Sequence, residues 1–214
     1  MLKNKLKILV VLGTRPEAIK MAPIILTMKK SKDVELRVCI TAQHREMLDQ
    51  ALEIFDILPD YDLDLMKHNQ SLSELTSSIL SQMPSILDQF QPHLMLVHGD
   101  TATTFAASLA AYYKKIDVAH VEAGLRTGNI YSPWPEEANR KLTSVIANYH
   151  FAPTAGSKNN LLNEGVSEND ITVTGNTVID ALHWTLKRIQ SDQVRATRLQ
   201  RILNQHLSFN WKKD

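Results

Sequence analysis

Three carboxylates stand where apolar runs end or where helical segments begin, and together they could line one acidic cleft. Glu122 closes the apolar run of residues 118–121, and Asp100 closes an earlier run at residues 94–99. Glu136 follows the long, turn-rich loop after Glu122 and opens a helical segment. Carboxylates that crowd together raise the pKa of at least one member, which supplies an acid and a base near neutral pH. The positions of these residues at strand ends and helix starts therefore suggest a single cleft.

Each of these carboxylates also has a structural interpretation. Asp100 precedes an alanine-rich helical segment, as a helix N-cap does. Glu136 and Glu137 follow Pro135, the expected first residue of a helix, where negative charge complements the helix dipole. Glu122 ends a buried apolar run and is poorly placed for a solvated surface. Capping and function thus stay open for Asp100 and Glu136, whereas Glu122 favours function.

The first strand-to-helix turn, residues 13–17, carries a cation where an anion could bind. Arg15 adjoins the expected helix N-terminus, which offers backbone N–H groups to a phosphate. Lys20 lies one turn further along and could face the same ligand. The turn has neither the GxGxxG nor the GxxxxGK pattern, so the sequence does not support a dinucleotide or P-loop site. The alternative is a solvated Arg15 and a Lys20 whose alkyl chain lies along apolar surface.

Short apolar runs alternate with helical patterns along the chain. Strands are expected at residues 6–12, 34–41, 62–65, 94–99, 117–121, 150–152 and 171–173, and helices at residues 16–30, 44–55, 71–90, 101–113, 136–148, 155–164 and 177–189. This alternation predicts an α/β fold with a parallel sheet covered by helices on both faces. The basic tail after residue 190 is either a terminal surface helix or a linker helix that leads elsewhere.

Composition argues against several other classes of protein. A net charge of +1 is too small for bulk binding to nucleic acid or to an anionic membrane surface. The apolar runs are strand-sized, and the N-terminus has no secretory signal pattern. Cys39 is the one cysteine, and we expect it to be buried in a cytoplasmic protein. The histidines lack metal-ligand spacing, so no metal site is predicted, and His98 and His120 are interpreted as core residues.

Six longer motifs resemble a single family. They are GTRPEAIKMAP at 13–23, TAQHREML at 41–48, HGDT at 98–101, VEAGLRT at 121–127, SPWPEEANR at 132–140 and TGNTVIDAL at 174–182. Together they resemble the non-hydrolysing UDP-N-acetylglucosamine 2-epimerases of bacteria, over nearly the whole chain up to residue 189. The resemblance implies two Rossmann-like domains that face each other across a cleft, in the GT-B (glycosyltransferase-like) architecture. Residues 1–190 would form the N-terminal Rossmann-like domain, and residues 191–214 a linker helix and tail toward a C-terminal domain that the chain lacks.

The resemblance also implies a reaction. This family interconverts UDP-N-acetylglucosamine and UDP-N-acetylmannosamine by eliminating UDP with loss of the carbon-2 proton and then adding UDP back. Such chemistry needs a base, an acid on the opposite face and cations for the departing diphosphate, but no nicotinamide or other cofactor. Asp100, Glu122 and Glu136 match the family's catalytic carboxylates. Arg15 and Lys20 match its substrate-binding cations, and Asp100 and Glu122 also contact substrate in this family.

Further expectations follow from the same resemblance. Gln43, His44 and Gln70 match the neighbourhood in which some members bind a second UDP-N-acetylglucosamine as an activator. The full-length protein is expected to be a homodimer in the cytoplasm that supplies precursors for surface polysaccharide. This chain, as the N-terminal half, is expected to show little activity alone. The alternatives are a hydrolysing 2-epimerase, which releases free N-acetylmannosamine, and a nucleotide-sugar-binding module without catalysis.

Overall fold

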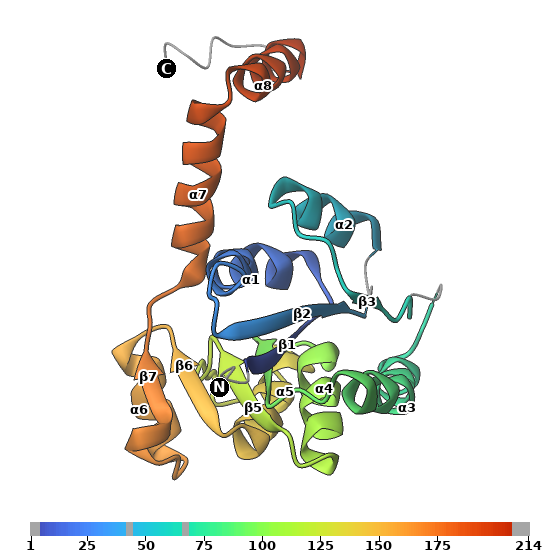
Figure 1. Ribbon diagram of the computed structural model, residues 1–214. Coiled ribbons are helices and arrows are strands. Elements are labelled where there is room, and N and C mark those ends of the chain that lie inside the picture. The colour runs from blue at the N-terminus through green and yellow to red at the C-terminus, as the bar shows by residue number, and fades with distance from the viewer. Residues whose placement is uncertain (1–4, 42–44, 66–68, 207–214) are drawn as a thin grey trace.

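A computed structural model describes residues 5–41, 45–65 and 69–206 of the chain. Its centre is a seven-stranded sheet in the order β3-β2-β1-β4-β5-β6-β7, with every neighbouring pair parallel (Figure 1). The strands are β1 (Leu6–Leu12), β2 (Val34–Ile40), β3 (Tyr61–Asp62), β4 (Leu94–His98), β5 (Asp117–Val121), β6 (Tyr149–Ala152) and β7 (Ile171–Val173). The predicted α/β fold with a parallel sheet is confirmed.

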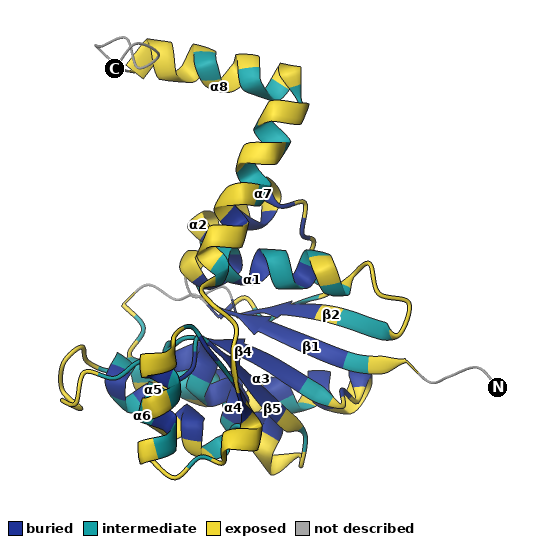
Figure 2. Cartoon of the chain, turned by 90° about the vertical axis from the view of Figure 1, so that its left-hand side faces the viewer, coloured by how far each residue is buried: buried dark blue, intermediate teal, exposed yellow. Residues whose placement is uncertain are grey.

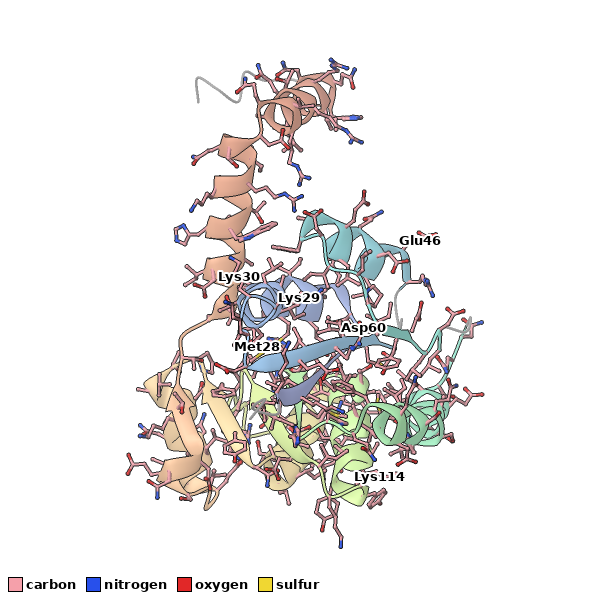
Figure 3. The ribbon with its side chains drawn as sticks, viewed as in Figure 1. Met28, Lys29, Lys30, Glu46, Asp60 and Lys114 are labelled. Carbon is pink, nitrogen blue, oxygen red and sulfur yellow. The ribbon has the colours of Figure 1, made fainter. Side chains whose placement is uncertain are left out.

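Helices cover both faces of this sheet. The helices of the chain are α1 (Arg15–Met28), α2 (Arg45–Ile54), α3 (Leu72–Phe90), α4 (Ala102–Tyr113), α5 (Glu136–Ile146), α6 (Ala155–Asn163), α7 (Thr177–Ser191) and α8 (Gln193–His206), with a 3₁₀ turn at Glu168–Asp170. The α8 helix has no buried residue and lies away from the sheet. The α1 helix ends one residue before Lys29, and the Lys29 and Lys30 side chains lie at that end (Figure 3). Among the residues described, no helix is long and apolar enough to cross a membrane.

The two faces bury separate apolar clusters because side chains of a strand alternate in direction. Ile8, Val10 and Leu12 of β1 pack with α1 and α2 on one face, together with part of α7. Leu9 and Val11 pack with α3 and α4 on the other. Figure 2 shows that the buried residues concentrate in the central strands and in the helix faces that meet them. A sheet buried on both faces explains the continuous apolar run that marks β1 in the sequence.

The strand order reverses between β1 and β4, and this places three loops at one edge. From β1 the chain crosses to β2 on one side, and β4 then pairs with β1 on the other. The last residues of β4 and β5, His98 and Val121, are in register. The loops after β1, β4 and β5 therefore leave the sheet at the same edge, beside the switch point where open α/β sheets bind ligands.

Two segments differ from the sequence prediction. The strand expected at residues 62–65 is observed as the two-residue β3 at the sheet edge. The helix expected at residues 177–189 continues to Ser191, turns at Asp192 and is followed by α8. Figure 1 shows α7 rising from the sheet domain and α8 turning away at its far end. Trp184 anchors α7 by packing on Phe55, with a ring-centroid distance of 5.0 Å.

Candidate active site

The turn after β1 is shaped by a buried carboxylate. Glu17, in the first turn of α1, accepts hydrogen bonds at Oε2 from the backbone N–H groups of Gly13 at 2.8 Å and Thr14 at 2.6 Å. These bonds satisfy donors that a helix N-terminus otherwise leaves unpaired. Arg15, the first residue of α1, is exposed, and no described residue hydrogen bonds or forms an ion pair with it. The turn thus presents a free guanidinium at a helix N-terminus.

The turn after β4 carries Asp100, which is held by residues of a neighbouring helix. The N-cap of α4 is Thr101, whose hydroxyl accepts from the backbone N–H of Thr104, so the interpretation of Asp100 as the cap is wrong. Asp100 Oδ2 instead accepts from Arg140 of α5, at 2.9 Å from Nε and 2.6 Å from Nη2. Asn139 donates to the backbone carbonyl of the same residue at 2.9 Å. The Asp100 side chain is therefore fixed by α5 rather than by α4.

Glu122 follows β5 in a left-handed conformation, with a φ of 64°. Its Oε2 atom lies 2.5 Å from Lys20 Nζ and 2.8 Å from His98 Nε2. Burial acts to raise the pKa of Glu122, but His98 and Lys20 outweigh burial and lower it to about 2. Glu122 is thus not a carboxylate whose pKa is raised, because a cation and an imidazole face it.

The interpretation of His98 as a core residue describes its burial but not its contact with the site. Its side chain is 4% exposed, which agrees with a core histidine, but its Nε2 atom faces Glu122 at the edge of the site. His120 is fully buried and its Nε2 contacts the carbonyl oxygen of Gly99 at 2.7 Å. Burial lowers the pKa of His120 to about 3, so its ring is neutral at physiological pH. Both histidines are therefore buried as expected, and His98 in addition contacts a predicted site residue.

Glu136 and Glu137 begin α5 but have different surroundings. Glu137 is fully buried and accepts from the backbone N–H groups of Thr127 and Gly128 and from Arg140. Burial opposes ionisation of Glu137, yet these donors lower its pKa below the ordinary value of 4.5. Glu136 has a buried Oε2 atom without a hydrogen-bond partner among the described residues. Glu137 thus clamps the long loop onto α5, whereas Glu136 keeps a free carboxylate oxygen.

The structure brings most of the predicted residues to one edge. Lys20 and Glu122 are in direct contact, as noted above. Glu136 lies one helical turn before the two α5 residues that hold Asp100, on the same face of that helix. Arg15 stands at the neighbouring turn without a contact to the others. Gln43 and His44 lie outside the described residues, and Gln70 has a buried Nε2 atom with no partner among the described residues.

Four residues of this edge are not among the predicted site residues. Two of them contact predicted ones directly, because His98 meets Glu122 and Arg140 meets Asp100. Their partners come from elements far away along the chain, which local patterns do not reveal. One signal was readable, because a Thr-x-x-Glu pattern opens α1 as a capping box does. The missed residues are Glu17, His98, Glu137 and Arg140.

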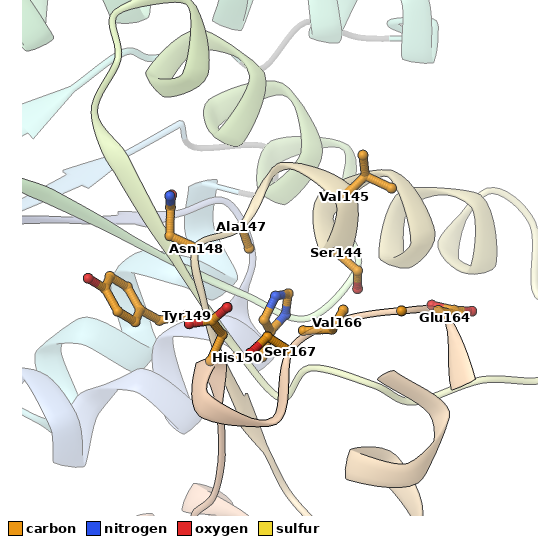
Figure 4. A pocket seen from close by; sticks show the side chains of 11 residues that line it. Ser144, Val145, Ala147, Asn148, Tyr149, His150, Glu164, Val166 and Ser167 are labelled. Atoms are coloured by element: carbon orange, nitrogen blue, oxygen red, sulfur yellow. The ribbon is translucent and has the colours of Figure 1, made fainter. Parts of the chain in front are cut away.

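A pocket of about 650 Å³ lies at the opposite end of β6 from these residues (Figure 4). The end of α5, the start of β6 and the segment 164–170 line it. His150 faces this pocket among Ser144, Val166 and Ser167 in Figure 4. None of the predicted catalytic or substrate-binding residues lines it. The pocket is therefore separate from the candidate site.

Comparison with known proteins identifies the family. The sequence profile of the UDP-N-acetylglucosamine 2-epimerases matches residues 26–209. The chain belongs to the UDP-N-acetylglucosamine 2-epimerase family. A curated UDP-N-acetylglucosamine 2-epimerase of Neisseria meningitidis serogroup A is 60% identical over 190 residues, which are 89% of this chain and 51% of that protein. The chain thus spans about half the length of the curated relatives of this epimerase family that it matches.

Solved structures agree with this family. The crystal structure of the Neisseria meningitidis UDP-GlcNAc 2-epimerase bound to UDP-GlcNAc has a TM-score of 0.88 and 56% sequence identity, covering 94% of this chain and 55% of that one. A galactosyltransferase of the lipopolysaccharide outer core has a TM-score of 0.58 at 15% identity, covering 79% and 45% of the two chains. The second likeness concerns the fold of this chain alone, which is similar to about half of a glycosyltransferase chain.

Proposed function

We propose that this chain is the N-terminal half of a non-hydrolysing UDP-N-acetylglucosamine 2-epimerase that interconverts UDP-N-acetylglucosamine and UDP-N-acetylmannosamine. The proposal is supported by the family membership and by the relative of known structure that binds UDP-GlcNAc. One observation carries it. Asp100 and Glu122 are each paired with a cation at the switch-point edge, while Glu136 beside them has an unpartnered oxygen.

The reaction explains why such a set of groups is needed. The proton on carbon 2 of the sugar is not acidified by a carbonyl group, so direct deprotonation is prohibitive. Elimination of UDP from carbon 1, with loss of the carbon-2 proton to a base, gives a glycal. UDP then adds back to carbon 1, and an acid delivers a proton to the opposite face of carbon 2, which completes the inversion. This route requires groups that move a proton on each face and groups that stabilise the departing diphosphate.

The surroundings of the carboxylates support different roles for them. Glu122, with its pKa near 2, stays ionised at neutral pH and is a poor proton donor, which suits orientation of the sugar and of Lys20. Asp100 is held by Arg140, which leaves its Oδ1 atom for the substrate. Glu136 has no cationic partner among the described residues, and we assign proton exchange at carbon 2 to it.

Arg15 is assigned to the diphosphate. Its side chain is exposed at the N-terminus of α1, where the helix dipole and a guanidinium together favour a negative group. Departure of UDP places additional charge on the β-phosphate, so this contact strengthens as the bond breaks. No cofactor takes part in the proposed reaction.

A second domain completes the proposed cleft. In the two-domain arrangement, residues 1–190 supply one wall, α8 belongs to the linker, and the other wall comes from sequence beyond this chain. The 214-residue chain alone is therefore expected to bind UDP weakly and to turn over little substrate. The full-length enzyme is proposed to be a cytoplasmic homodimer that supplies N-acetylmannosamine units for surface polysaccharide.

Product analysis tests this function. The full-length protein that contains this chain is incubated with UDP-N-acetylglucosamine, and the products are separated by chromatography and identified by NMR. The proposal predicts UDP-N-acetylmannosamine at equilibrium with substrate, without free sugar. Accumulation of free N-acetylmannosamine and UDP would identify a hydrolysing enzyme instead, and unchanged substrate with measurable binding would leave only a nucleotide-sugar-binding module.

A further inference from the structure

Glu17 is a buried carboxylate that the proposed reaction does not use. Its side chain is 3% exposed, and it lies in the first turn of α1 behind Arg15. The two hydrogen bonds that its Oε2 atom accepts from Gly13 and Thr14 hold the backbone of the first turn. An N-terminal cap of α1 needs no more than that oxygen. The second oxygen is therefore available for another purpose.

The Oε1 atom of Glu17 reaches a different helix. It accepts a hydrogen bond from the hydroxyl of Thr101 at 2.8 Å and lies 3.2 Å from the hydroxyl of Thr104. Thr101 is the N-cap of α4, and its oxygen also accepts from the backbone N–H of Thr104 at 3.1 Å. A single carboxylate thus joins the N-termini of α1 and α4, whose bridging residues are 84 positions apart in the sequence.

The two turns are also packed too closely to move independently. A Cβ atom built on Gly13 would lie 2.2 Å from the Thr103 hydroxyl oxygen, which is closer than real Cβ contacts. The same hydroxyl is 2.9 Å from that of Thr41 at the end of β2. Any displacement of the α4 turn is therefore transmitted to the α1 turn through both packing and the Glu17 bridge.

The bridged turns carry two residues of the proposed site. Arg15 follows directly after the backbone N–H groups that Glu17 holds, and Asp100 directly precedes Thr101. The two arrive on separate crossovers, and no contact between their side chains fixes their spacing. We propose that Glu17 is a positioning residue that sets the spacing between Arg15 and Asp100 by joining their turns through Thr101. This inference rests on the proposed function, in which Arg15 takes the diphosphate and Asp100 the sugar.

The alternative is that Glu17 only caps α1 and contributes to stability. Variants of Thr101 separate the two roles, because they leave Glu17 and its bonds to the α1 backbone in place. Thr101→Val removes the shorter of the two hydroxyl bonds to Glu17 Oε1 together with the N-cap of α4, and Thr101→Ser keeps both. Both keep a side chain of similar or smaller size. Ser71→Ala is the matched control, since Ser71 caps α3 by the same kind of bond to Glu74 N–H and bonds neither Glu17 nor Thr101.

The first arm uses the 214-residue chain and needs no activity. In amide NMR spectra, Thr101→Val is expected to shift the signals of Gly13 and Thr14, because Glu17 loses one of its donors and relaxes. Thr101→Ser is expected to leave these signals near their wild-type positions, and Ser71→Ala to leave them unmoved. Unshifted Gly13 and Thr14 signals in the folded Thr101→Val chain would overturn the bridge itself.

The second arm measures steady-state kinetics of the full-length protein at a temperature where all variants are folded. We expect Thr101→Val to lower kcat by roughly 10- to 100-fold, since misplacement of about 1 Å at a reacting centre has an effect of that order. KM should change less, and Thr101→Ser should restore kcat. A Thr101→Val kcat no lower than that of Ser71→Ala would refute the positioning role. An inactive wild-type enzyme would refute the proposed function instead, and the NMR arm would still decide whether the bridge couples the two turns.

Discussion

Replacement of Lys20 by methionine tests the electrostatics of the site on the 214-residue chain alone. Methionine keeps the length and apolar stem of lysine but removes the ammonium group that contacts Glu122 Oε2. The Glu122 side chain is 15% exposed, so the loss leaves a largely buried carboxylate with His98 as its remaining partner. Because burial then opposes ionisation with less compensation, the pKa of Glu122 should rise.

The size of the effect follows from linkage between ionisation and folding. Glu122 has an ordinary pKa of 4.5 and a folded-state pKa of about 2, so the folded protein stabilises the ionised form. At about 1.4 kcal/mol for each pKa unit, this difference is worth about 3 kcal/mol above pH 4.5. The contribution is lost as the pH falls from 4.5 through 2. Lys20 is one of two partners, and its removal should lower the free energy of unfolding at pH 7 by about 2 kcal/mol.

Urea unfolding measured between pH 2 and pH 7 checks this prediction, together with a carboxylate ¹³C NMR titration of Glu122. The matched control is Lys114→Met, which removes an exposed ion pair between the C-cap residue of α4 and Asp88 of α3. Lys114 is labelled in Figure 3. Exposed pairs contribute little, so the control should change stability by less than about 0.5 kcal/mol. A Lys20→Met chain as stable at pH 7 as the control, with Glu122 still titrating near pH 2, would refute the electrostatic account.

Three further variants or probes address other parts of the fold. Gly13→Ala should lower the free energy of unfolding by roughly 1–3 kcal/mol in urea titrations, because the added Cβ would meet the Thr103 hydroxyl at 2.2 Å. Arg140→Lys should cost about 2 kcal/mol in the same assay, because an ammonium cannot reproduce the fork that binds Asp100 and buried Glu137 together. Cys39 should resist thiol reagents at pH 8 in the folded chain, because burial raises the pKa of its thiol to about 12.

Each of these has a control within the chain. Gly156→Ala adds a Cβ whose nearest neighbour is 3.7 Å away, so it should not destabilise α6. Arg37→Lys alters an exposed pair with Asp60 and should change stability by less than about 0.5 kcal/mol. Cys39 should react readily once the chain is unfolded in urea. Equal stability of Gly13→Ala and Gly156→Ala would contradict the close contact at Gly13. Equal losses of stability for Arg140→Lys and Arg37→Lys would contradict the role of the Arg140 fork. Rapid labelling of Cys39 in the folded chain would contradict its burial.

Much of the fold could be predicted because its signals are local. The apolar run of β1 was placed at residues 6–12, where the strand is observed, since a strand buried on both faces leaves no polar alternation. The start of α3 followed from the Ser71 capping box, which the structure contains. The edge strand β3 was misplaced because an edge strand is short and only one neighbour defines it. The boundary between α7 and the helical tail was expected after residue 189 and lies two residues later, because no glycine or proline marks it.

The candidate site was predictable in its location but not in its electrostatics. Parallel strands send their carboxyl ends to one edge, so the residues after β4 and β5 had to approach each other. The partners of each charge come from other elements, and these decide the ionisation. Lys20 and His98 determine the pKa of Glu122, and the Arg140 fork takes Asp100 away from the capping role that its position suggested. Contacts across 24 to 102 positions of sequence leave no local pattern.

The proposed function requires carboxylates at this edge to exchange the proton on carbon 2 of a UDP-linked sugar. The most direct measurement is incubation of the full-length protein with UDP-N-acetylglucosamine in heavy water, followed by NMR at carbon 2. The account predicts deuterium at carbon 2 of both epimers for the wild type, and a sharp loss of that exchange in a folded Glu136→Gln variant. Epimerisation without deuterium at carbon 2, or unchanged exchange in Glu136→Gln, would contradict it.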